Sequence, residues 1–107
     1  MYAEEAMEHF ARLLEISDTA IQEGQTTELH YIELAMTETL NQIEQALGPE
    51  AAARESVAAR IDSLRGLALR LHDAGHDGSV PLAANVQQAM RNAFAELKAE
   101  LEMRNEP

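Results

Sequence analysis

The chain has 107 residues, of which 46% are apolar, no cysteine, and a formal net charge of −11. Its length suits a single domain with one core over residues 1–107, and the missing cysteines exclude disulfides, thiolate metal sites and thiol nucleophiles. The acidic charge disfavours nucleic-acid binding and adsorption to anionic membranes, because both need a basic surface.

The first half of the chain predicts two amphipathic helices joined by a short turn. Apolar residues recur every three or four positions over residues 3–23 and again over residues 26–47, which is the spacing of one helix face. Gly24 ends the first helix in the left-handed conformation, and Thr26 or Thr27 caps the second. The two core stripes are Ala3, Ala6, Met7, Phe10, Leu13, Leu14, Ala20 and Ile21, then Leu29, Ile32, Met36, Leu40, Ile43 and Leu47.

The second half predicts another pair of helices. Gly48 ends the preceding helix, and Pro49 opens the third helix at a position where a missing N–H is harmless. The third helix continues to Gly75, and Ser79 can cap the fourth. The corresponding stripes are Ala53, Val57, Ile61, Leu64, Ala68 and Leu71, then Ala83, Val86, Met90, Phe94, Leu97 and Leu101.

Short turns between long helices make sequential neighbours antiparallel. We therefore predict an all-α fold, an up-down-up-down antiparallel four-helix bundle, with hairpins over about residues 3–47 and 50–104. Gly24 and Gly75 lie 51 residues apart, and at that offset many small and apolar positions coincide. A duplicated hairpin explains this, and so does the general similarity of amphipathic hairpins.

The two interhelical turns resemble those of a known family. Gly24-Gln25-Thr26 and Gly75-His76-Asp77-Gly78 each precede an Ala-rich amphipathic helix, LHYIELAMTETLNQIEQA and VPLAANVQQAMRNAFAEL. In this the chain is similar to the small metal-binding protein family of ammonia-oxidising and related bacteria. The resemblance implies a periplasmic four-helix bundle of duplicated hairpins that binds divalent metals, copper above all.

This chain departs from the family in one important respect. Family members carry many histidines along their helices, whereas this sequence has four, and Gln25 stands where the family has His. Only His76 occupies a family-like motif position, so the fold carries over more safely than the metal binding. Nothing at the N-terminus has the form of a signal peptide, so without the resemblance the expected location is the cytoplasm.

The predicted topology brings potential metal ligands to one end of the bundle. The first and third turns share that end, and imidazole with carboxylate suits copper, nickel or zinc. The candidate metal ligands are His72, His76, His30, Asp73 and Asp77.

Two alternatives stay open for this end. We expect Gly75 to break the helix between His72 and His76, which weakens a His-x3-His pair. The histidines then act as solvated residues at a helix C-terminus, where a protonated imidazole favours the helix dipole. His9, one turn after Glu5, lies at the other end, where the two form a surface metal clip or a simple hydrogen bond.

No pattern in the sequence supports an enzyme. A di-iron site needs a Glu-x-x-His motif, and no histidine here has Glu three residues before it. The alternative to metal binding is a protein-interaction module or homodimer, which docks through the acidic first hairpin or through apolar residues outside the main stripes. Those residues are Ile16, Tyr31, Leu34, Leu67, Leu69 and Leu82.

Overall fold

The protein is helical throughout the part of the chain that the computed structural model describes, residues 3–104. It contains no strand there, which confirms the predicted all-α class. The ends of the predicted 1–107 domain lie outside the described residues. The elements in chain order are α1 (Ala3–Gln22), the short 3-10 helix η1 (Thr26–Glu28), α2 (Leu29–Leu47), α3 (Pro49–Ala53), α4 (Glu55–His76) and α5 (Val80–Arg104).

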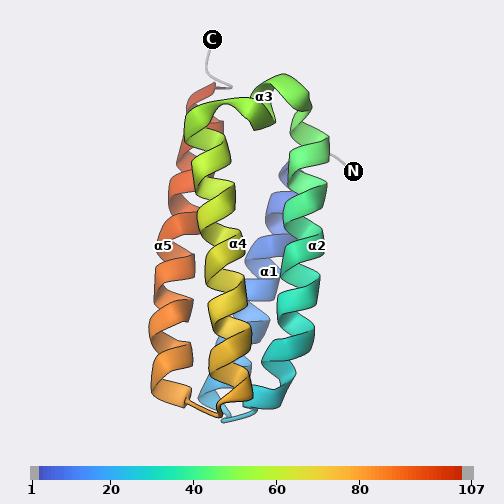
Figure 1. The fold of residues 1–107 in the computed structure, drawn as a ribbon. Coiled ribbons are helices and arrows are strands. Elements are labelled where there is room, and N and C mark those ends of the chain that lie inside the picture. Colours follow the sequence, from blue (N-terminus) through green and yellow to red (C-terminus); the bar gives the residue numbers. More distant parts are fainter. Residues whose placement is uncertain (1–2, 105–107) are drawn as a thin grey trace.

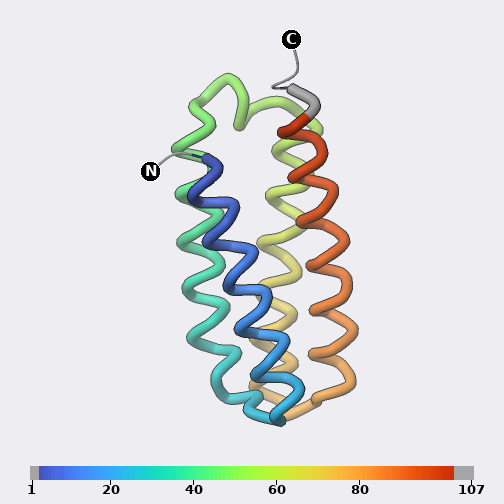
Figure 2. Tube along the Cα trace, turned by 180° about the vertical axis from the view of Figure 1, so that it is seen from behind, coloured from blue at the N-terminus to red at the C-terminus, as the bar shows by residue number. Residues whose placement is uncertain are grey.

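The four long helices lie side by side along one axis (Figures 1 and 2). The molecule measures 45 × 22 × 18 Å along its principal axes. α1 packs against α2 and α5, and α4 packs against the same two helices. The α1–α2 and α4–α5 connections lie together at one end, the turn end, and α3 crosses the opposite end (Figure 1).

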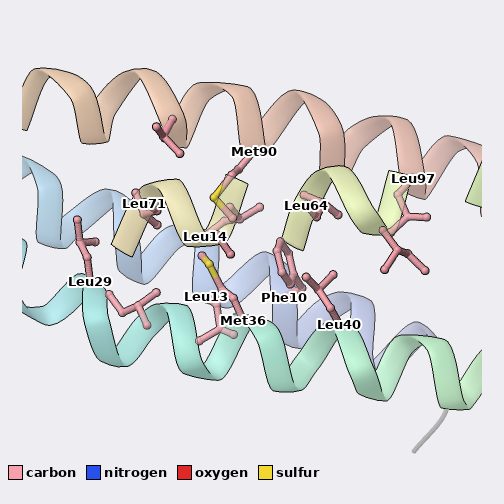
Figure 3. Packing of buried hydrophobic residues seen from close by; sticks show 14 of the residues in the cluster. Phe10, Leu13, Leu14, Leu29, Met36, Leu40, Leu64, Leu71, Met90 and Leu97 are labelled. Atoms are coloured by element: carbon pink, nitrogen blue, oxygen red, sulfur yellow. The ribbon is translucent and has the colours of Figure 1, made fainter. Parts of the chain in front are cut away.

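Side chains from all four long helices fill one continuous core (Figure 3). Most members of the predicted stripes are buried, and the Phe10 and Phe94 rings stack with centroids 5.2 Å apart. Leucine, alanine and isoleucine are the commonest residues in this core, and methionine adds flexible side chains that fill gaps between the helices. The period of the apolar residues therefore predicted the buried faces correctly along most of the chain.

The predicted third helix is wrong at its start. The chain leaves the helical conformation at Arg54, where φ is −63° and ψ is 133°, so that α3 and α4 are separate helices. α3 begins with Pro49 and carries the chain across the end of the bundle from α2 to α4 (Figure 1). Ala53, which we assigned to the core stripe, is consequently exposed.

Gly75 does not end its helix as predicted. α4 continues to His76, and the residue that takes a positive φ is Gly78, at +69°. Gly75 is instead buried against η1 and the start of α2. A Cβ atom there would lie 2.6 Å from the carbonyl oxygen of Thr26 and 2.8 Å from Cβ of Leu29. Glycine is thus required for close approach of two segments.

The two turns at this end share one hydrogen-bond pattern. The N–H of Gln25 donates to the Ala20 carbonyl at 2.8 Å, and that of Ser79 donates to the Ala74 carbonyl at 3.0 Å. In both, a glycine with positive φ precedes the donor, which is the usual helix C-cap arrangement. Gly24 therefore corresponds to Gly78, and the spacing between the two hairpins is 54 residues, in place of the predicted 51.

At a spacing of 54 residues the buried positions of the two halves coincide. Met36 falls on Met90, and the buried polar residue Glu33 falls on Gln87, which is also buried. Further coincident pairs of buried residues are Met7 with Ile61, Phe10 with Leu64, Leu14 with Ala68, Ala20 with Ala74, Leu29 with Ala83, Ile32 with Val86 and Ile43 with Leu97.

A buried polar contact joins α1 to α5. The Ser17 hydroxyl donates to Oε1 of Gln87 at 2.7 Å, and Nε2 of Gln87 donates to the Leu14 carbonyl at 2.8 Å. Both side chains are almost fully inaccessible to solvent. Because buried polar groups cost free energy when unpaired, this contact favours one longitudinal register of the two helices.

We predict that Gly75→Ala lowers the free energy of unfolding by about 1–3 kcal/mol, because the new methyl group overlaps Thr26 and Leu29. Gly66→Ala is the matched control. Gly66 lies in the same helix with open space around it, so alanine there raises stability by up to about 1 kcal/mol through helix propensity. Urea unfolding measures the free energy of unfolding of both variants. Equal changes in stability would contradict the close approach at Gly75.

We predict that Gln87→Ala lowers the free energy of unfolding by about 1–3 kcal/mol, because it removes the buried hydrogen bonds of Gln87 with Ser17 and with the Leu14 carbonyl and leaves a cavity. The exposed neighbour provides the control, since Gln88→Ala should change stability by less than about 0.5 kcal/mol. Thermal and urea unfolding followed by circular dichroism distinguish the two variants.

Candidate functional site

The turn end brings together two histidines from different hairpins. His30 lies in the first turn of α2 and His72 near the end of α4, and the missing side chain at Gly75 lets these segments approach closely. Nδ1 of His30 lies 2.6 Å from Nε2 of His72. The ring centroids are 4.7 Å apart, with the planes inclined at 50°. Two imidazole nitrogens therefore face each other across the α2–α4 contact.

A carboxylate approaches the other side of this pair. Oδ1 of Asp73 lies 3.5 Å from Nδ1 of His72. One of the two facing nitrogens donates to the other, and the tautomers of the two rings decide which one is the donor. The pair is open to solvent, because His30 is exposed and the His72 side chain retains 31% of its accessible surface.

The other predicted ligands do not join this contact. His76 and Asp77 are exposed at the end of α4 and the start of the turn. Within residues 3–104, no group of three or more His, Asp or Glu side chains is arranged to hold a metal ion. The structure thus unites His30 and His72, with Asp73 beside them, and leaves His76 and Asp77 apart from the pair.

The helix between His72 and His76 is continuous, contrary to our expectation. Both residues belong to α4, four positions apart, and the chain turns only at Gly78. His9 lies in the first half of α1, and α1 begins at the end of the bundle opposite the turn end (Figure 2). Sequence reasoning placed three imidazoles at one end but could not find the direct contact, because that depends on how closely the helices approach.

A second feature is an open apolar cavity of about 520 Å³ at the α3 end. Side chains of Met7, Leu47 and Leu101 line it, with Glu4, Glu8 and Lys98 at the polar positions. It contains no histidine or hydroxyl group.

Comparison with models of known protein families, with curated proteins and with solved structures finds no match to this chain. The resemblance to the small metal-binding family accordingly stays a prediction. Between residues 3 and 104, none of the helices combines the length and apolar character that a membrane crossing requires.

We predict that His72→Ala lowers the free energy of unfolding by no more than about 1.5 kcal/mol, because it removes one solvent-accessible hydrogen bond. The adjacent substitution Leu71→Ala should cost about 2–5 kcal/mol, since Leu71 is fully buried. Urea unfolding in the presence of a chelator compares the two. A loss for His72→Ala as large as that for Leu71→Ala would show that the histidine pair is structural.

Proposed function

We propose that this chain is a non-catalytic, up-down-up-down four-helix bundle that binds a divalent metal ion weakly through His30 and His72. The observation that carries the proposal is the 2.6 Å contact between Nδ1 of His30 and Nε2 of His72. When His30 carries its proton on Nε2 and His72 carries its proton on Nδ1, the two facing nitrogens each offer a lone pair to a cation. Neutral imidazole nitrogens are ligands for copper, nickel and zinc, whereas magnesium and calcium prefer oxygen.

The geometry allows a metal to enter with a small movement. Two nitrogens bound to zinc at about 2.0–2.1 Å in a tetrahedral site lie about 3.3 Å apart. The two facing nitrogens therefore need to move apart by about 0.7 Å. Rotation of the two solvent-accessible side chains allows a movement of this size. Asp73 supports this role, because a carboxylate near the outer nitrogen of a ligating histidine orients the ring.

The affinity should be modest, since one chain supplies two imidazoles and water fills the remaining positions. The surface around the site contributes long-range attraction for cations, because the first 48 residues contain ten acidic residues and one basic residue. Copper forms the most stable complexes with such donors among these metals. The resemblance to the small metal-binding family also favours copper and a periplasmic location, which fractionation of the native cells can test.

The spacing of 54 residues supports an origin of the bundle by duplication of one hairpin. The two glycine turns and most buried positions coincide at this spacing. The two histidines do not correspond to each other at that offset, since His72 aligns with Asp18 and His30 with Ala84. The proposed site therefore joins positions that are not equivalent in the two hairpins.

We predict that His30→Ala and His72→Ala each weaken the binding of Cu(II), Ni(II) and Zn(II) by more than about tenfold, because each removes one of two ligands. His9→Ala is the control and should leave the affinity unchanged, because His9 lies in the first half of α1, which begins at the end opposite the turn end (Figure 1). Isothermal titration calorimetry measures all three. Wild-type affinity in both His30→Ala and His72→Ala would refute the proposed function.

A further inference from the structure

We propose that the metal at His30 and His72 is shared by two copies of the chain, which join through the outer surface of the α2–α4 contact. This inference rests on the proposed function, since it concerns the same site. One copy offers an incomplete ligand set, because within residues 3–104 no group of three His, Asp or Glu side chains is arranged to hold a metal ion, and Asp73 approaches the outer nitrogen of His72. A second copy contributes an identical pair, and two pairs supply the four ligands of a tetrahedral metal site.

The residues beside the pair are apolar and exposed. Tyr31, with 72% of its surface accessible, follows His30 directly, and their rings meet edge to face with centroids 5.4 Å apart. Leu34 lies one turn after His30 on α2, and Leu69 lies one turn before His72 on α4. These two leucines expose 55% and 56% of their surface.

Helical spacing places the two leucines on the same surface as the histidines. Residues three or four apart share one helix face, so Leu34 lies on the His30 face and Leu69 on the His72 face. α2 and α4 run in opposite directions, and Arg65 binds Glu44 at 2.8 Å further along the same contact. We call the surface formed by His30, Tyr31, Leu34, Leu69 and His72 the α2–α4 patch.

Ion pairs occur at several helix contacts, including Arg60 with Glu96 and Arg91 with Asp18. Exposed apolar residues also occur outside the patch, at Ile16, Val80 and Leu82. In the α2–α4 patch, aromatic and aliphatic groups lie beside the imidazoles, together with the carboxylate of Asp73. Exposed apolar residues thus lie beside an incomplete set of metal ligands. We therefore expect this surface to be covered by the chain that supplies the missing ligands.

A second copy fits this patch better than an unrelated partner does. A twofold axis through the metal brings each pair opposite an identical pair, and the same rotation places the apolar residues of one patch on those of the other. Any partner other than a second copy must supply metal ligands of its own at a matching separation. The metal also reduces the repulsion between two chains that each carry a net charge of −11, because two positive charges lie where the surfaces meet.

The test is analytical ultracentrifugation of the full chain with Zn(II) and with a chelator. We expect a monomer of 11.8 kDa with the chelator and a species of twice that mass with zinc, containing one metal ion for two chains. Dimer formation should reverse when the chelator is added back. A monomer that binds one zinc ion per chain would overturn the dimer and leave the proposed function standing, whereas a monomer that binds no zinc would refute both.

Variants of the apolar residues separate the dimer from the metal site. Leu34→Gln and Leu69→Gln should weaken zinc-dependent dimerisation by more than about tenfold while both chains stay folded, since both residues are exposed. Ile16→Gln is the matched control, because Ile16 is an exposed apolar residue of α1 outside the patch, and it should dimerise normally. Normal dimerisation of both leucine variants would overturn the proposed interface.

One further variant excludes a monomeric site with three histidines. His76 follows His72 by one helical turn, so rotation of its side chain offers a third ligand within the same chain. His76→Ala should leave the one-to-two stoichiometry and the dimer unchanged. Loss of zinc binding in His76→Ala, or a dimer that forms equally well with the chelator, would contradict the shared site.

Discussion

The close approach of α4 to η1 and the start of α2 governs the geometry of the turn end. It is possible because Gly75 has no side chain where a Cβ atom would meet the Thr26 carbonyl and Leu29. The approach sets the distance between the two hairpins at this end, and it brings His30 within 2.6 Å of His72. A residue that we expected to end a helix thus sets the helix spacing on which the candidate site depends.

Polar contacts specify the arrangement that the apolar core permits. Apolar stripes that repeat along each helix tolerate shifts of a turn, because a leucine one turn away fills a similar space. The buried contact of Ser17 with Gln87 does not tolerate such a shift. Two ion pairs, Arg91 with Asp18 and Arg65 with Glu44, connect the acidic first hairpin to the second, which carries most of the basic residues. The uneven distribution of charge along the sequence therefore also provides ion pairs between the two hairpins.

The histidine pair combines local order with an open surface. Its two rings come from separate helices, so their spacing depends on the whole bundle and not on one flexible loop. Asp73 and the adjacent apolar residues surround the pair without covering it. In our proposal, such a site binds a cation weakly by itself and gains affinity when further ligands arrive from outside, so that metal binding and association of two chains form one linked equilibrium.

The sequence by itself determined the helical class, the four buried faces and the end at which His30, His72 and His76 gather, because these depend on local periodicity and on short turns. It did not determine the break at Arg54, where no glycine or proline marks the change. Nor did it show that Gly75 lies inside a helix, since a glycine suits both a stop and a close contact. The pairing of His30 with His72 was decided only by the tertiary structure, because the distance between two side chains on different helices depends on how closely those helices pack.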